Sequence, residues 1–217
     1  MKCFEDIDNI FFDFDGTVCD TEADIRDSWH KAFAELKLDV PHFDRDYRVG
    51  PNIREAAPVL FPGFDAATID RICEVYRKYY YSSDYPKSHP YPGVDSMLEK
   101  LRAEGKKLFL ATNKNYAPLK QLVDKLHWNG IFTELLNRDM LPPGVTDKAY
   151  LIRLALEKYA LDPRRSAMVG DTDIDINAGK AAGIVTVAAT YGYGTLDELT
   201  ASGADRMLSL NEVREYL

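Results

Sequence analysis

Short apolar runs recur along the chain, and each ends in small or polar residues. The clearest runs are IFFDF at 10–14, KLFLATN at 107–113, SAMVGDT at 166–172 and GIVTVAAT at 183–190. Two weaker runs are FTELLNR at 132–138 and DRMLSL at 205–210. Short apolar runs without polar alternation are typical of parallel strands that are buried on both faces. The pattern therefore predicts a sheet of parallel strands.

Segments with helical spacing lie between these runs. Apolar side chains recur three and four positions apart in 95–105, 117–128 and 149–161, which is the period of a helix with one buried face. Gly105 stands where a C-terminal cap would end the first of these helices. Strands that alternate with helices in this way predict an α/β fold with a doubly wound, Rossmann-like parallel sheet.

The alternation is interrupted after the first strand. Between residues 18 and 88 no run has the pattern of a buried strand, whereas 21–38 and 66–80 carry apolar and aromatic residues at helical spacing. Thr21 is of a residue type that caps the N-terminus of a helix, and it opens the first of these segments. The pattern therefore predicts a helical insert.

We therefore expect two domains. The α/β core, which we expect to be catalytic, comprises 1–17 and 89–217, and the helical insert comprises 18–88. Linkers near 17–21 and 84–92 would join the two domains and would flex. A chain of 217 residues is long enough for one sizeable domain that carries an insert.

The acidic balance of the chain narrows the class of partner. Lys and Arg together number 27 against 35 Asp and Glu, a formal charge of −8 at pH 7. Proteins that bind nucleic acid normally present a basic face, so we expect no nucleic-acid partner. A binding site for phosphate in such a chain must rely on local cations or on a metal ion.

Cysteine usage and hydropathy indicate the compartment. Cys3, Cys19 and Cys73 are odd in number and match no metal-binding spacing, so we expect free thiols in a reducing environment. The first residues lack the apolar core of a signal peptide, and no apolar run approaches the length of a membrane span. We therefore expect a soluble cytoplasmic protein without a membrane partner.

Polar side chains follow the predicted strands at the points where the strands end. They are Asp13 and Asp15 after the first strand, Thr112 and Asn113 after the second, and Asp171 and Asp175 after another, with Lys148 at a predicted helix start. In a parallel α/β sheet, binding sites form beyond the carboxyl ends of the strands. If these strands are neighbours, the polar groups meet in one pocket.

Converging carboxylates have a definite chemistry. They repel one another and need a cation in order to coexist, and a ligand set made only of oxygen atoms favours Mg²⁺. A metal ion, the ammonium group of Lys148 and the hydroxyl of Thr112 together would form a receptor for a phosphoryl group. A carboxylate that is not fully neutralised can then act as a nucleophile.

The order of these groups is similar to that of a known family. The motifs DFDGT, ATN, a lone lysine and GDTDID resemble the four motifs of the haloacid dehalogenase-like superfamily, and the resemblance covers nearly the whole chain. The helical insert resembles the cap of the subgroup that includes phosphoglycolate phosphatase and β-phosphoglucomutase. The tail AAGIVTVAATYGYGTLDEL is similar to the phosphoglycolate phosphatase branch, in which Gly-Tyr-Gly follows the last core strands.

The resemblance implies catalytic roles for four residues. Asp13 would be the nucleophile that attacks phosphorus, and Asp15 would be the general acid for the leaving alcohol and then the base for water. Thr112 would hydrogen-bond a phosphoryl oxygen, and Lys148 would neutralise charge on Asp13 and on the phosphoryl group. Haloacid dehalogenases and phosphonatases lack an aspartate at the position of Asp15, so its presence favours chemistry on phosphate esters.

The resemblance also implies a magnesium site. Asp171 would hold Mg²⁺ directly, together with an oxygen of Asp13 and the backbone carbonyl of Asp15. Asp175 would act through metal-bound water or through Lys148.

The remaining candidates would contact the substrate. Gly16 would allow the turn that aims the two aspartates, and Thr17 and Asn113 would help to form the phosphoryl site. Arg48 and Arg54 flank a Gly-Pro turn in the insert and would reach an anionic substrate, although a solvated loop explains them equally well.

Three positions depart from the family pattern. Ala149 follows the lysine where proline is usual, Ile174 stands where asparagine is common, and Asp173 adds a carboxylate. These departures affect the division of roles at the fourth motif and leave the reaction class intact.

The resemblance implies a Mg²⁺-dependent phosphatase of a small phosphorylated metabolite such as phosphoglycolate. It would form an aspartyl-phosphate intermediate and work as a monomer or homodimer. A sugar-phosphate mutase of the β-phosphoglucomutase type would use the same aspartates, and a 5'-nucleotidase or pyrophosphatase of the same family fits nearly as well. A phosphate-sensing receiver module, which also uses an acceptor aspartate, is a rival of another class, but it needs neither the insert nor Asp15.

Overall fold

The computed structural model describes residues 4–51 and 53–216. The chain divides into two compact units, one formed by Met1–Asp20 with His89–Leu217 and the other by Thr21–Ser88. We call the first the core unit and the second the helical unit.

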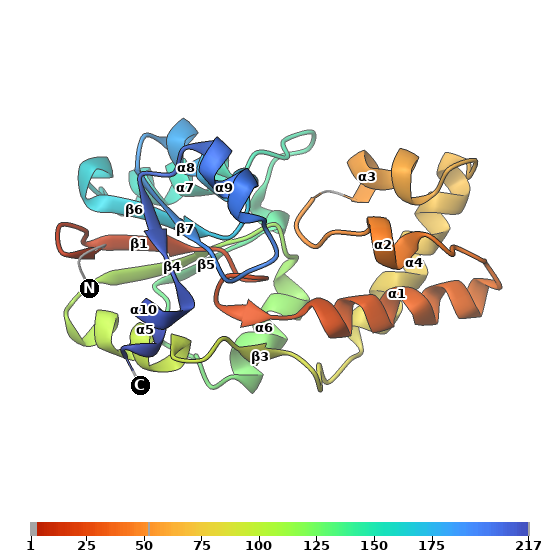
Figure 1. Cartoon of the computed structure of the whole chain (residues 1–217), viewed down its shortest axis with the longest axis horizontal. Helices are drawn as coiled ribbons and strands as arrows, with labels where there is room; N and C mark the ends of the chain where they lie inside the picture. The colour runs from red at the N-terminus through yellow and green to blue at the C-terminus, as the bar shows by residue number, and fades with distance from the viewer. Residues whose placement is uncertain (1–3, 52, 217) are drawn as a thin grey trace. The chain divides into compact units, whose positions relative to one another are not determined.

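A six-stranded sheet forms the centre of the core unit, and its neighbouring strands are parallel (Figure 1). In spatial order the strands are β5 (Glu134–Leu136), β4 (Lys107–Ala111), β1 (Asn9–Phe12), β6 (Ser166–Gly170), β7 (Val185–Ala189) and β8 (Arg206–Leu208). Each of the six apolar runs in the sequence therefore contributes a strand, which is shorter than the run itself. The predicted doubly wound parallel sheet is confirmed.

Burial explains why these runs become strands. All residues of β1 and β6 are buried, and the ring of Phe11 on β1 stacks on Phe109 of β4 with centroids 4.8 Å apart. β1 is central, with β4 on one side and β6 on the other. It ends at Phe12 because the chain then turns, and the carbonyl of Phe14 accepts a hydrogen bond from the N–H of Cys19 at 3.0 Å.

Helices cover both faces of this sheet. Figure 1 shows α7, α8 and α9 on one side and α5, α6 and α10 on the other. Their bounds are α5 (Val94–Ala103), α6 (Tyr116–Lys125), α7 (Ala149–Lys158), α8 (Asp173–Ala182), α9 (Leu196–Ser202) and α10 (Leu210–Arg214), with short 3₁₀ helices η2 (Arg138–Met140) and η3 (Pro163–Arg165). The sequence predicted α5, α6 and α7. Gly105, with φ of 80°, follows the end of α5 in the left-handed conformation expected of a C-terminal cap.

A short ladder forms where the sequence predicts the two linkers. β2 (Cys19–Asp20) pairs with β3 (His89–Pro90) in antiparallel orientation. The sequence shows no pattern of a buried strand between residues 18 and 88, and it therefore gave no sign of the strand at Cys19–Asp20. A two-residue strand is too short to leave an alternating pattern in the sequence.

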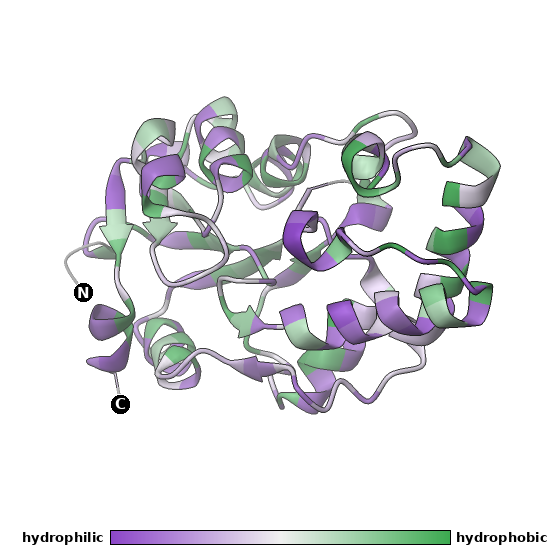
Figure 2. Ribbon diagram, turned by 45° about the vertical axis from the view of Figure 1, so that its right-hand side comes forward, coloured by the Kyte–Doolittle hydropathy of each residue, from purple (hydrophilic) through white to green (hydrophobic). Residues whose placement is uncertain are grey.

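The helical unit consists of α1 (Glu22–Leu36), α2 (Phe43–Asp46), α3 (Ile53–Leu60) and α4 (Ala66–Tyr81). Figure 2 shows hydrophobic and hydrophilic bands alternating along the helices, as expected where one face is buried. In its interior the ring of Trp29 on α1 stacks on Tyr76 of α4 with centroids 3.9 Å apart. Thr21 is the N-cap residue of α1, as predicted, although its side chain makes no capping hydrogen bond.

Two further expectations concern membrane spans and cysteines. Within residues 4–51 and 53–216, no helix has both the length and the apolarity that a membrane crossing requires. Cys19 and Cys73 are buried free thiols, and burial raises the pKa of the Cys19 thiol above its ordinary value. Cys3 lies outside the described residues.

Candidate active site

The predicted site residues of the core unit follow three neighbouring strands. Asp13 and Asp15 come after β1, Thr112 comes after β4, and Asp171 comes after β6. Because the spatial order is β4–β1–β6 and the strands are parallel, their carboxyl ends meet at one edge of the sheet.

Three carboxylates form a compact cluster at this edge. Each of Asp13, Asp171 and Asp175 offers an oxygen within 4.8 Å of the oxygens offered by the other two. Asp171 and Asp175 are fully buried and Asp13 is 8% exposed. Asp175 lies in the first turn of α8, where its Oδ2 accepts hydrogen bonds from the backbone N–H and the hydroxyl of Thr172 at 3.1 and 2.9 Å. This capping box fixes one carboxylate oxygen of Asp175 and leaves the other toward the cluster.

Lys148 is the cation of this cluster. It is the N-cap residue of α7 and is 2% exposed. Its Nζ lies 2.5 Å from Oδ1 of Asp175 and 3.0 Å from Oδ1 of Asp13, the latter at ion-pair distance without hydrogen-bond alignment. Burial opposes the charge of Lys148, but the two carboxylates outweigh burial and raise its pKa. The lysine is therefore held as an ammonium ion.

The cluster carries more negative charge than Lys148 can balance. Burial, together with the neighbouring carboxylates, raises the pKa of Asp13 and of Asp171 above the ordinary value of an aspartate. Both carboxyls therefore keep a proton to a higher pH than an ordinary aspartate does unless a further cation is near. Three buried carboxylates within 4.8 Å of one another are a donor set that fits a hard divalent cation.

Asp171 is held at both of its oxygens. The hydroxyl of Thr17, which the sequence places among the substrate contacts, is fully buried and donates to Oδ1 of Asp171 at 2.7 Å. The backbone N–H of Tyr193 donates to Oδ2 at 2.8 Å, and the phenol of Tyr193 donates to Asp20 at 3.0 Å. A carboxylate with both oxygens hydrogen-bonded is fixed in orientation.

Glycines allow the backbone to approach Asp171 this closely. Gly16 has φ of 84°, and a Cβ at this position would lie 2.2 Å from Oδ2 of Asp171. A Cβ at Gly192 would lie 2.2 Å from the carbonyl oxygen of Gly16, and one at Gly194 would lie 1.9 Å from that of Asp171. The Gly-Tyr-Gly segment of the sequence is thus part of the wall around Asp171. The positive φ at Gly16 agrees with the predicted turn.

Lys114 is a second buried cation, which the sequence analysis did not single out. Its Nζ donates to Oδ1 of Asp15 at 2.7 Å, and the two side chains are 4% and 13% exposed. It follows the ATN motif immediately, and its backbone N–H donates to the hydroxyl of Thr112 at 3.2 Å. Oδ1 of Asn113 is buried, with no hydrogen-bond partner among the described residues. The motif could have drawn attention to Lys114, but a lysine alone reads as a surface residue.

Arg48 and Arg54 belong to the helical unit rather than to the core unit. Both are exposed, and Arg54 forms an ion pair with Asp70 of α4. Their predicted role toward the substrate stays a prediction.

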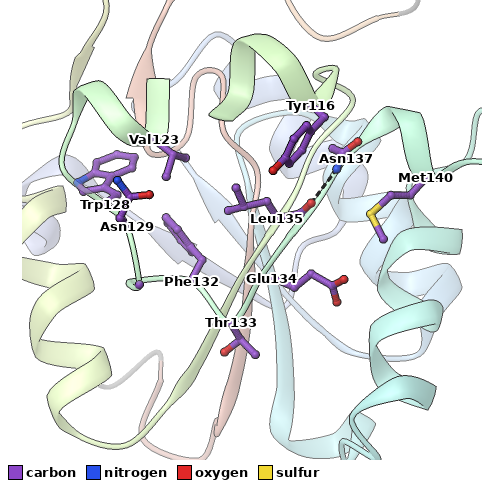
Figure 3. Close-up of a pocket in the computed structure, with 11 residues that line it drawn as sticks. Tyr116, Val123, Trp128, Asn129, Phe132, Thr133, Glu134, Leu135, Asn137 and Met140 are labelled. Atoms are coloured by element: carbon purple, nitrogen blue, oxygen red, sulfur yellow. Dashed lines mark hydrogen bonds between the residues drawn. The ribbon is translucent and has the colours of Figure 1, made fainter. Parts of the chain in front are cut away.

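A cavity of about 400 Å³ lies elsewhere in the core unit (Figure 3). It is lined by α6, β5 and the segments around them, with Trp128, Phe132 and Met140 among its walls, and Asn137 donates to the carbonyl of Leu135 at 2.8 Å. It shares no residue with the carboxylate cluster. The cluster, rather than this cavity, is the candidate active site because the reactive groups converge there.

Known proteins resemble this chain over most of its length. A phosphoglycolate phosphatase from Aquifex aeolicus (strain VF5) is 32% identical over 190 residues, which are 87% of this chain and 87% of that protein. A 5'-nucleotidase from Pseudomonas aeruginosa is 28% identical over 194 residues, 89% of this chain and 87% of that protein. The crystal structure of a predicted phosphatase from Clostridium acetobutylicum has a TM-score of 0.82 at 23% identity, and it matches 96% of this chain and 97% of its own.

A family model gives the same result. The model that describes haloacid dehalogenase-like hydrolases matches residues 10–189, which include the strand-end residues of β1, β4 and β6. The resemblance stated from the four motifs is confirmed, and with it the expectation that the chain is an enzyme, a hydrolase. The chain belongs to the haloacid dehalogenase-like hydrolase family.

Proposed function

We propose that this chain is a phosphatase that hydrolyses the phosphate ester of a small metabolite through an aspartyl-phosphate on Asp13. One observation carries the proposal: Asp13 stands at the end of the central strand, 3.0 Å from the Nζ of Lys148 and within 4.8 Å of two further carboxylates. A nucleophile in such a setting has a cation beside it to balance the charge of an incoming phosphoryl group. The name of the Aquifex relative supports hydrolysis of phosphate esters.

The first half of the reaction transfers the phosphoryl group to the enzyme. A carboxylate oxygen of Asp13 forms a bond to phosphorus, and the bond between phosphorus and the leaving oxygen breaks. Asp15 gives its proton to the leaving oxygen, so that the product departs as an alcohol. Lys148 stays paired with Asp13 and balances charge on the phosphoryl oxygens.

The second half releases phosphate. Asp15, now ionised, takes a proton from a water molecule whose oxygen bonds to phosphorus, and the bond from phosphorus to Asp13 breaks. Inorganic phosphate leaves and both aspartates return to their starting forms.

The buried carboxylates would hold Mg²⁺. The ligands would be Asp13, Asp171 and the backbone carbonyl of Asp15, with Asp175 acting through water or through Lys148. The ion would supply positive charge to the phosphoryl oxygens. We propose that Thr17 positions Asp171 for this purpose, because its hydroxyl donates to that carboxylate.

The remaining predicted residues would bind substrate. Thr112, Gly16 and Asn113 would surround the phosphoryl group, and the helical unit would act as a cap whose Arg48 and Arg54 meet the substrate. Phosphoglycolate is the substrate that we propose first, because relatives that are 30% identical or more are named phosphoglycolate phosphatase. A nucleoside 5'-monophosphate is the second candidate, because the Pseudomonas relative is named a 5'-nucleotidase.

Phosphate release from a panel of phosphorylated metabolites, with Mg²⁺ and with EDTA, tests the proposal. We expect turnover that requires Mg²⁺ and that Asp13→Asn abolishes while the protein stays folded, because the carboxamide has a similar shape and is a poor nucleophile. Isomer formation without phosphate release would favour a mutase. A single, self-limited phosphorylation would favour a receiver module. Substantial turnover by Asp13→Asn would exclude the covalent route.

A further inference from the structure

The core unit holds a second buried cation that the proposed chemistry does not use. Among the described residues, Lys114 and Lys148 are the buried lysines, with 8% and 2% of the whole residue exposed. Lys148 pairs with Asp13 and Asp175, on the side of the phosphoryl group. Lys114 instead pairs with Asp15. A buried ammonium group is unfavourable unless it is paired, so a second one beside the reacting groups calls for a role.

The backbone fixes Lys114 in this place. Its N–H donates to the hydroxyl of Thr112 at 3.2 Å, and its carbonyl accepts from the N–H of Arg138 at 3.1 Å. Asp139 of η2 accepts hydrogen bonds from the side chain of Asn115 and from the N–H of Tyr116, the latter at 2.8 Å. The segment that carries Lys114 is therefore tied on both sides, and the side chain starts from a fixed point.

The ammonium group of Lys114 lies on the leaving-group side of the reaction. Asp15 must be within hydrogen-bond distance of the leaving oxygen if it is to protonate that oxygen. The Nζ of Lys114 is 2.7 Å from Oδ1 of Asp15, so the leaving group lies within about two hydrogen-bond lengths of Nζ, about 6 Å. Lys148 pairs with Asp13 and Asp175, so Lys114 is the buried lysine that pairs with the proposed acid of the leaving group.

We propose that Lys114 recognises negative charge on the leaving group, and that the site therefore prefers phosphate esters of short hydroxy acids over esters of neutral alcohols. An ammonium group has three N–H donors, so Lys114 can keep Asp15 and still donate to a carboxylate of the substrate. The inference rests on the proposed function. It favours phosphoglycolate, whose leaving group carries a carboxylate, over a nucleoside monophosphate, whose leaving sugar is neutral.

A matched pair of substrates isolates this charge. 2-Phosphoglycolate and 2-hydroxyethyl phosphate are both two-carbon phosphate esters and differ in carrying a carboxylate or a hydroxymethyl group. The variants are Lys114→Met, which keeps the length without the charge, and Lys114→Arg, which keeps the charge. Lys107→Met, at an exposed position on the opposite end of β4, is the control.

Phosphate release gives kcat/KM for each substrate and variant. We expect wild type, Lys107→Met and Lys114→Arg to prefer phosphoglycolate. Lys114→Met should lose about 10- to 100-fold in kcat/KM on phosphoglycolate, as for a charged hydrogen bond, and much less on 2-hydroxyethyl phosphate. Equal losses on the two esters would overturn the inference, since Lys114 would then only position Asp15. Wild type without a preference for the anionic ester would overturn it as well.

A binding measurement separates this inference from the proposed function. Calorimetric titration of the Asp13→Asn protein with each ester needs no turnover, and it is repeated with Lys114→Met or Lys114→Gln added. Tighter binding of phosphoglycolate that the second substitution removes supports Lys114 even if the wild type releases no phosphate, in which case only the proposed function fails. Equal binding of the two esters overturns the role of Lys114 even if phosphate is released.

Discussion

Without a bound metal ion, the carboxylate cluster should make the free energy of unfolding depend on pH. The Asp13→Asn variant isolates the contribution of Asp13 to this dependence. Burial raises the pKa of Asp13 from 3.8 to about 6; Lys148 opposes this change, and the charges of Asp175 and Asp15 add to it. A carboxyl whose pKa is higher in the folded than in the unfolded chain contributes stability that is complete below 3.8. That stability is lost as the pH rises through about 6.

The size of the effect follows from the same two values. The interval between 3.8 and about 6, at about 1.4 kcal/mol for each pH unit, corresponds to about 3 kcal/mol in the free energy of unfolding. Asparagine does not ionise, so the variant does not lose this stability. Between about pH 4 and about pH 8, Asp13→Asn should therefore gain about 3 kcal/mol relative to wild type.

Urea unfolding followed by circular dichroism, in EDTA and across this pH range, measures the difference. The other carboxylates are present in both proteins, but the charge of Asp13 raises the pKa of Asp171, so the measured difference includes this coupling. Asp39→Asn, at an exposed position in the helical unit, is the control that should leave the pH dependence unchanged. Added Mg²⁺ should stabilise the wild type most at the higher pH, where the carboxylates are ionised, because an ion that binds the folded state stabilises that state. A difference between Asp13→Asn and wild type that stays constant with pH would refute this account of the cluster.

Two further predictions concern the surroundings of Asp171. Thr17→Val removes the hydroxyl that donates to Oδ1 at 2.7 Å; we expect divalent-cation affinity, measured by calorimetry, to fall about 10- to 100-fold, and Thr17→Ser to restore most of it. Gly194→Ala places a Cβ 1.9 Å from the carbonyl oxygen of Asp171; the overpacking should cost about 1–3 kcal/mol in urea unfolding, and an unchanged unfolding midpoint would contradict the close approach.

The sheet was predictable because strands that are buried on both faces appear in the sequence as apolar runs. All five residues of β6 are buried and, apart from Ser166, none has a polar side chain, so the run is visible without any partner strand. The short helices α9 and α10, of seven and five residues, were not predicted. Over such lengths the helical period barely repeats, so the pattern has little to distinguish it from a loop.

The same reasoning explains which part of the candidate site was missed. Asp13 and Asp171 are acids that follow apolar runs, and such positions stand out. The ion pair between Lys114 and Asp15 joins residues 99 positions apart, and a lysine in isolation is most often exposed. The donor from Tyr193 to Asp171 is a backbone N–H, which every residue except proline carries, so no residue type marks it. Contacts of this kind are properties of the fold and are found only when the strands are placed side by side.

The charges at the strand ends connect the proposed metal site with the proposed leaving-group site. In the proposed mechanism Asp15 carries a proton when the ester binds, so Asp13, Asp171 and Asp175 supply three carboxylates. Lys114 and Lys148 supply two ammonium groups, which leaves an excess of one negative charge. That excess would repel an approaching phosphate dianion. Burial and the neighbouring carboxylates already raise the pKa of Asp13 and of Asp171. One divalent cation more than offsets the excess and leaves a net positive charge for the phosphate dianion. We therefore expect the metal-loaded form to be the one that receives a phosphate ester, with Lys148 beside the phosphoryl group and Lys114 beside the leaving group.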